Sequence, residues 1–141
     1  MTDTPKTPTA AEFAATVREA FSFLQRFGFQ EVAAPDHRSS DSFRFWFSAG
    51  DRSVVVAGEG WGTMASVTLE QGGLELPEIF LVPSDERPAR KKKTRPDQLE
   101  QIREAARRLE RFATDFLEGD LSRFAARARP LPPYKQPPVT K

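Results

Sequence analysis

The sequence contains no cysteine, and this absence excludes several classes of site at once. Disulfide bonds, thiolate zinc sites, iron–sulfur clusters and cysteine nucleophiles all need a residue that the chain lacks. There is one histidine, His37, so a metal site with two histidine ligands is excluded as well. We therefore predict neither a metal site nor a cofactor.

Long apolar runs are also missing. The longest strictly apolar segments, Val54 to Ala57 and Ile79 to Val82, have four residues each, whereas a membrane-spanning helix needs about 20. The first ten residues lack the basic start and the apolar stretch of a secretion signal. We expect a soluble, cytoplasmic protein that does not bind a membrane.

The composition is typical of one globular domain with polar ends. Hydrophobic residues make up 38% of the 141 residues, 29% are charged and twelve are proline. A chain of this length can bury a single core without the help of disulfides. We predict a disordered N-terminus over residues 1–8, one domain over 9–128 and a proline-rich, disordered tail over 129–141.

Two long amphipathic helices are predicted near the two ends of the domain. The first runs from about Thr9 to Phe27, because Thr9 and Glu12 form a capping box and Gly28 suits the left-handed end of a helix. Its apolar stripe comprises Phe13, Val17, Phe21, Leu24 and Phe27. The second begins near Pro96 and ends at Gly119, and a shorter helix follows from Asp120 to about Ala128. The stripe of the second comprises Leu99, Ile102, Ala106, Leu109, Phe112, Ala113 and Phe116.

The middle of the chain predicts short strands joined by tight turns. In one of them three phenylalanines alternate with Arg44 and Trp46, the period of two that defines a strand: Phe43, Phe45 and Phe47. The expected strands are Phe29–Ala33, Phe43–Phe47, Arg52–Ala57, Met64–Leu69 and, at an edge, Glu78–Val82. The fold class is therefore α+β: an antiparallel meander of four to five strands, with both long helices on one face of the sheet.

This arrangement predicts a binding surface on the other face of the sheet. If the phenylalanines meet the helices, Arg44 and Trp46 point the opposite way. Glu59 and Trp61 lie in the glycine-rich turn Gly58–Gly62, which we interpret as a structural turn. We expect Arg44, Trp46, Glu59 and Trp61 to contact a partner protein, with Trp46 uncovered on this face. Trp61, at the tip of the turn, either packs onto the core or is offered to the partner.

Two alternatives come from other segments. The half of the chain from residue 84 carries a net charge of +6 and the half before it −5, so the basic half either faces a partner or docks on the acidic half. The predicted linker 84–95 contains a basic run that could bind the phosphates of a nucleic acid: Arg90, Lys91, Lys92, Lys93 and Arg95. His37, flanked by Asp36 and Asp41, is the only candidate centre for a hydrolase, although no nucleophile motif accompanies it.

Two segments resemble a group of small uncharacterised bacterial proteins. Residues 21–29 (FSFLQRFGF) resemble the opening helix of these proteins, and residues 116–124 (FLEGDLSRF) resemble a closing helix that ends in GDxSxF. That group is similar to immunity-type proteins of polymorphic toxin systems. The resemblance implies the α+β layout and no catalytic residues. We predict a non-enzymatic protein-binding module of this type, whose partner is a toxin or a second copy of the chain.

Overall fold

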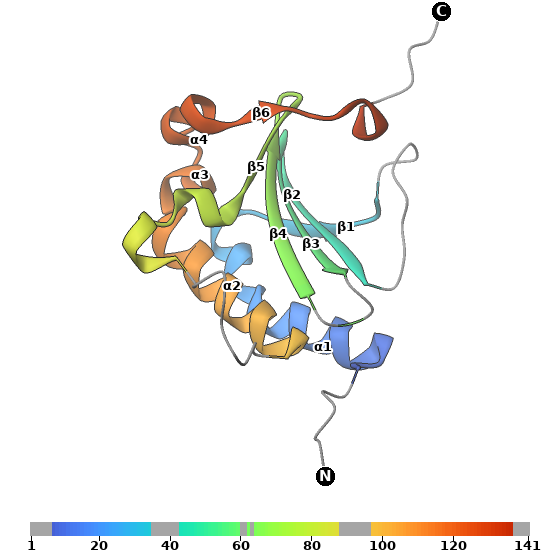
Figure 1. The fold of residues 1–141 in the computed structure, drawn as a ribbon. Coiled ribbons are helices and arrows are strands. Elements are labelled where there is room, and N and C mark those ends of the chain that lie inside the picture. The colour runs from blue at the N-terminus through green and yellow to red at the C-terminus, as the bar shows by residue number, and fades with distance from the viewer. Residues whose placement is uncertain (1–6, 35–42, 60–61, 63, 88–96, 137–141) are drawn as a thin grey trace, which may run out of the picture.

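The computed structural model describes residues 7–34, 43–59, 62, 64–87 and 97–136. Six antiparallel strands form one sheet in the order of the sequence (Figure 1). This confirms the predicted α+β class, with one strand more than the four to five expected. The strands are β1 Gln30–Val32, β2 Arg44–Ala49, β3 Arg52–Glu59, β4 Met64–Gln71, β5 Leu74–Pro77 and β6 Arg129–Pro130. The α-helices are α1 Ala10–Ala20, α2 Gln98–Phe112, α3 Thr114–Glu118 and α4 Ser122–Arg127. The short 3₁₀ helices are η1 Ser22–Phe27, η2 Glu78–Leu81, η3 Ser84–Glu86 and η4 Pro133–Lys135.

Helix α1 starts as predicted but ends earlier. The Glu12 amide donates to the Thr9 hydroxyl (3.1 Å) and the Thr9 amide donates to the Glu12 carboxylate (3.0 Å), which completes the capping box. The single helix expected up to Phe27 is wrong, because α1 stops at Ala20 and η1 follows. The Ser22 hydroxyl donates to the Glu19 carbonyl (2.9 Å), a bond that competes with the regular helical pattern at this point. Gly28 ends the segment with a φ of 84°, as expected.

The second helical stretch is also divided. Asp97 caps α2 by accepting from the Glu100 amide (2.8 Å), and Gly119 ends α3 with a φ of 99°. Between them Ala113 leaves the helical conformation, so the predicted continuous helix is two. Arg52 of β3 donates to the carbonyls of Phe116 and Leu117 at 2.8 and 2.6 Å. Both carbonyls lie at the C-terminal end of α3, where the Phe116 carbonyl also accepts from the Gly119 amide (3.1 Å).

The last strands of the meander differ from the prediction. The segment predicted as the edge strand Glu78–Val82 forms η2 instead, and the strand next to β4 is Leu74–Pro77. The alternation of Leu74 and Leu76 matches the helix-covered face, whereas the Glu78 side chain turns to Arg108 of α2. The predicted disordered tail is also wrong for residues 129–136, because β6 pairs with β5 and the Leu131 amide donates to the Gly73 carbonyl (2.9 Å).

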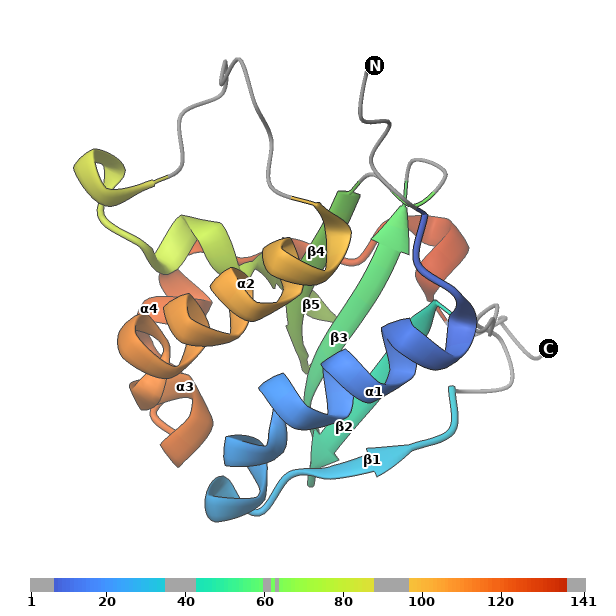
Figure 2. The same ribbon diagram turned by 90° about the horizontal axis from the view of Figure 1, so that it is seen from below.

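Both long helices cover the same face of the sheet (Figure 2). The buried Phe13 ring packs edge-on against Phe43 (5.1 Å between centroids) and tilted against Phe45 (5.9 Å). The buried Phe21 ring stacks on Phe47 (6.1 Å). Gly58 permits this approach: a Cβ there would lie 2.7 Å from the Gln98 amide nitrogen and 2.8 Å from the Phe13 ring. No helix in the described part of the chain is long and apolar enough to cross a bilayer.

Candidate functional site

The face of the sheet turned away from the helices, here called the reverse face, brings together two of the four predicted partner-binding residues. Arg44 of β2 and Glu59 of β3 both line a cavity of about 150 Å³. The remaining lining residues are Val55, Ala57, Ser66, Thr68, Glu70, Tyr134 and Lys135. Tyr134 and Lys135 belong to the C-terminal segment, residues 131–136, so this segment covers part of the face that was expected to be open.

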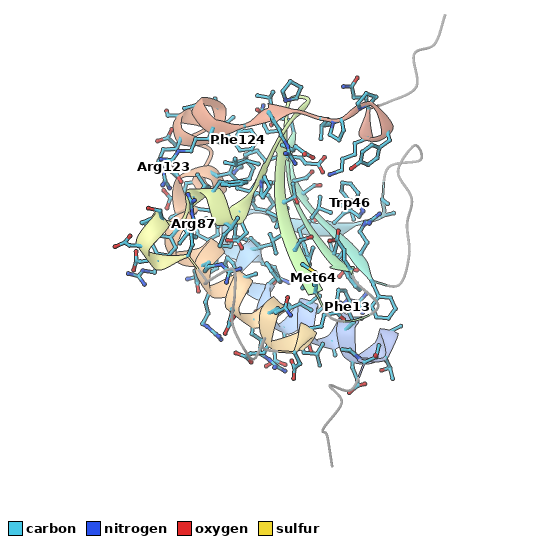
Figure 3. The ribbon with its side chains drawn as sticks, viewed as in Figure 1. Phe13, Trp46, Met64, Arg87, Arg123 and Phe124 are labelled. Carbon is cyan, nitrogen blue, oxygen red and sulfur yellow. The ribbon has the colours of Figure 1, made fainter. Side chains whose placement is uncertain are left out.

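Trp46 faces the predicted side but is not exposed. It pairs in register with Val55 of β3 and Val32 of β1, and Figure 3 places its side chain away from α1 and α2. Only 4% of its surface is accessible, so the expectation of an exposed indole is wrong. Strand alternation decides the side to which a residue points, whereas exposure depends on what else packs there. Trp46 is therefore buried on the reverse face, outside the main hydrophobic core cluster.

Several predicted site residues lie outside the described residues. These are Trp61, the basic run Arg90, Lys91, Lys92, Lys93 and Arg95, and the candidate catalytic group His37, Asp36 and Asp41. They stay predictions. Among the described residues, no group of three or more histidine, aspartate or glutamate side chains could hold a metal ion.

A larger hollow lies beside β5, where η2, α4 and β6 meet. It encloses about 430 Å³ and is lined by Glu75, Leu76, Pro77, Phe80, Arg87, Arg127 and Arg129. Figure 3 shows Arg87 beside η2, and Phe124 of the adjacent α4 close by. We call this hollow the arginine pocket.

Each of the three guanidinium groups in the arginine pocket is fixed along one edge. Arg87 donates to the Val82 carbonyl (2.9 Å) and lies over the Phe80 ring, 5.5 Å from its centroid. Arg127 donates to the Phe80 carbonyl (2.6 Å). Arg129 binds Oε2 of Glu75 through Nε (3.0 Å) and Nη2 (2.9 Å). A guanidinium has five N–H groups in a rigid plane, so each retains donors for a ligand after these bonds are made.

The arginine pocket retains positive charge, whereas most of the described arginines outside it are paired with acids. Within the described part of the chain, Arg87 and Arg127 bond backbone carbonyls and form no ion pair. Outside the pocket, ion pairs join Arg18 to Glu31, Arg26 to Glu110, Arg103 and Arg107 to Glu100, Arg108 to Glu78, Arg111 to Glu86, and Arg123 to Asp115. Arg52 is likewise bonded to backbone carbonyls, those of Phe116 and Leu117, but it does not line the pocket. The charge of Arg87 and Arg127 lies at one hollow, where it can attract an anion.

Among the described residues, Glu75 is the only acid that lines the pocket, and it is shared. Its side chain is 1% exposed; Oε2 accepts from Arg129, and Oε1 accepts from Lys135 at 2.8 Å. Burial disfavours the charged carboxylate, but the hydrogen bonds from Lys135 and Arg129 outweigh this cost and hold the pKa of Glu75 below its ordinary value. Glu75 is therefore an ionised group with two cationic partners.

Sequence reasoning did not find the arginine pocket. Its cations come from two segments about 40 residues apart: Arg87 follows η3, whereas Arg127 and Arg129 lie two residues apart where α4 leads into β6. The only signal was the basic excess of residues 84–141, which did not say where in the fold the charge gathers.

No protein-family model, no curated protein and no solved structure matches the chain. The likeness to immunity-type proteins thus continues to depend on the two short helix-end segments alone.

Proposed function

We propose that the protein is a non-enzymatic binding module that recognises an acidic segment of another protein through the arginine pocket. The observation that carries the proposal is the convergence of Arg87, Arg127 and Arg129 on one hollow. Two of these side chains lack a carboxylate partner in the described structure. Arginine forks bind carboxylates through charge-assisted hydrogen bonds, which are the stronger class of protein hydrogen bond.

The anchoring of the three arginines supports a binding role. Side chains that are already held lose less rotamer freedom when a ligand arrives, so more of the interaction energy remains as affinity. Apolar groups in the same wall would contact the body of a partner side chain: Leu76, Pro77 and Phe80, the last of which is 43% exposed. Arginine beside an aromatic ring is a common composition for the centre of a protein interface.

The shape of the charged region favours an acidic protein segment over a nucleic acid. Proteins that bind nucleic acids neutralise successive phosphates along a stripe or groove. Among the described residues, Arg87, Arg127 and Arg129 line a hollow of about 430 Å³, and the surrounding arginines of α2 are neutralised by Glu100, Glu78 and Glu86. A hollow of this size accommodates a few side chains of a partner.

This proposal keeps the predicted class of function and moves its location. Trp46 is buried and the C-terminal segment covers part of the reverse face, so the four-residue surface predicted from the sequence is no longer the favoured one. If the resemblance to immunity-type proteins reflects function, the partner with the acidic segment would be a toxin.

The proposal can be tested with a capped peptide, acetyl-Glu-Glu-Phe-Glu-Glu-amide, by calorimetry or fluorescence anisotropy at low ionic strength. The matched control peptide replaces each Glu by Gln. We expect the double variant Arg87→Gln/Arg127→Gln to bind the acidic peptide roughly 10-fold or more weakly than the wild type, since a hydrogen bond to a charged group contributes about 1.5–3 kcal/mol.

The control variant is Arg103→Gln/Arg107→Gln, which removes two exposed arginines that already pair with Glu100. We expect it to bind the peptide with an affinity within about two-fold of the wild type. Equal weakening by both variants would mean that the peptide responds to net charge rather than to the pocket, and would overturn the proposal. The proposal would also be overturned, in favour of nucleic-acid binding, if the double variant Arg87→Gln/Arg127→Gln lost affinity for a single-stranded oligonucleotide but not for the peptide.

A further inference from the structure

Glu75 connects the arginine pocket to the C-terminal segment, residues 131–136. It is the register partner of Arg129 across β5 and β6, so the two side chains lie next to each other on the same side of the sheet. On one side of its carboxylate Arg129 forms part of the arginine pocket, and on the other side Lys135 forms part of the reverse-face cavity. One buried acid thus bonds a cation from each of the two hollows.

The C-terminal segment has few other attachments to the sheet. Leu131 donates from its amide to the Gly73 carbonyl, and the Gln136 side chain returns to the Leu131 carbonyl within the segment itself (2.7 Å). Tyr134 is 77% exposed and lines the reverse-face cavity. The Lys135–Glu75 ion pair, with Glu75 nearly inaccessible to solvent and Lys135 22% exposed, is the contact that ties η4 to the reverse face.

We propose that Glu75 couples the two hollows, so that an acidic segment bound in the arginine pocket and the docking of Lys135 favour each other. The inference rests on the proposed function. An anionic ligand that binds the free N–H groups of Arg129 shares the positive charge that otherwise stabilises the Glu75 carboxylate. The ligand also adds negative charge close to Glu75. The buried carboxylate then depends more strongly on Lys135.

The reverse direction follows from thermodynamic reciprocity. When Lys135 is absent, Arg129 alone balances Glu75, and the pocket presents less positive charge to a ligand. Lys135 is accordingly a positioning residue: it does not line the arginine pocket, but it raises the affinity of that pocket through Glu75.

The coupling can be measured because Tyr134, next to Lys135, is the only tyrosine of the chain. Incorporation of 3-fluorotyrosine gives one ¹⁹F signal that reports on η4. The peptide acetyl-Glu-Glu-Phe-Glu-Glu-amide is titrated into the labelled full chain, and its affinity is measured in parallel. We expect the ¹⁹F signal of the wild type to shift on binding, although Tyr134 lies outside the arginine pocket.

Three variants separate coupling from a general loss of charge. We expect Lys135→Met to weaken the peptide about five-fold, at the low end of typical coupling between sites, and Lys135→Arg to retain the wild-type affinity. In Glu75→Gln the connection is removed, so the peptide no longer shifts the Tyr134 signal and the added Lys135→Met change has no further effect on affinity.

The possible failures are distinguishable. If the peptide binds in an Arg87- and Arg127-dependent way, but the Tyr134 signal does not move and Lys135→Met binds like the wild type, the coupling is overturned and the proposed function stands. If Lys135→Met weakens the peptide equally in the wild-type and Glu75→Gln backgrounds, the effect is general electrostatics and the role of Glu75 is overturned. Failure of the wild type to bind the peptide at all contradicts the proposed function and, with it, this inference.

Discussion

Glu75 and Glu78 are three residues apart and almost equally buried, yet their surroundings have opposite effects on their charge. Glu78 begins η2 and accepts from Arg108 of α2 at 2.7 Å and 3.1 Å, with 4% of its surface exposed. Burial raises the pKa of Glu78 above its ordinary value, and the single partner Arg108 does not fully compensate. Glu75 has two cations, and its pKa is lowered.

The difference separates a structural ion pair from a responsive one. Glu78 and Arg108 join η2 to α2 inside the helical layer, so the pair fixes one wall of the arginine pocket by holding the segment that carries Phe80. The single negative charge of Glu75 has two cationic partners, Arg129 and Lys135. A site with surplus cationic partners can accept further negative charge from a ligand, whereas a site whose acid is barely compensated cannot.

The largest expected effect comes from breaking the structural pair. Arg108→Met leaves the Glu78 carboxylate buried without its cation, and we expect the free energy of unfolding to fall by about 3–5 kcal/mol. Denaturant titration measures this change. Arg107→Met is the matched control, because Arg107 is 63% exposed and its pair with Glu100 is at the surface; we expect a loss below about 1 kcal/mol. Equal losses in the two variants would mean that Glu78 is not held by Arg108.

A smaller effect is expected at the responsive site. Glu75→Gln keeps the shape of the side chain but removes the charge that both Arg129 and Lys135 bind. We expect the free energy of unfolding to fall by about 1.5–3 kcal/mol, the range for hydrogen bonds to charged groups. Glu59→Gln, an exposed acid at the end of β3, serves as the control and should change stability by no more than about 0.5 kcal/mol. A Glu75→Gln protein as stable as this control would show that the shared ion pair does not hold the C-terminal segment.

The smallest effect is the dependence on pH, and its sign distinguishes the two acids. Because the folded-state pKa of Glu75 is lowered, its contribution is present above the ordinary glutamate pKa of about 4.3 and is lost as the pH falls through the folded value. The stability advantage of the wild type over Glu75→Gln should therefore shrink on acidification below about pH 4. The folded-state pKa of Glu78 is raised, so the wild type should gain stability relative to Glu78→Gln as the pH falls toward about 4.

These two differences are measured by thermal or denaturant unfolding of three proteins across the pH range. Each variant serves as the reference for its own acid, so the titration of the other carboxylates cancels to first order. Slopes of the same sign at both positions would contradict the comparison between the two sites.

The elements with strong periodicity were predicted well from the sequence. The alternation of Phe43, Phe45 and Phe47 placed β2 and its helix-facing side correctly, and the Thr9–Glu12 capping box placed the start of α1. These signals are local: a capping box involves four consecutive positions, and strand alternation follows from the geometry of the backbone.

The predictions that failed concern what a segment packs against. The run Glu78–Val82 is apolar enough for a strand, but the Glu78–Arg108 pair and the pairing of Leu76 with Leu69 give the strand position to Leu74–Pro77. The proline-rich sequence after Arg129 gave no sign that residues 129–136 would attach to β5 and to Glu75. Of the partner-binding residues, Arg44 and Glu59 share a cavity, whereas Trp46 is buried.

The chain's sequence alone determined the α+β class, the antiparallel meander and the side of the sheet that receives the helices. Each of these features depends on the spacing of apolar residues, which can be read within a single segment of the chain. Only the tertiary structure decided which cations share one hollow. Arg87, Arg127 and Arg129 are up to 42 residues apart in the chain and meet because α4 and β6 return to the edge of the sheet beside η2. The charge of a side chain is fixed by its type, but its neighbours, and hence whether that charge is neutralised or available, are fixed by the fold.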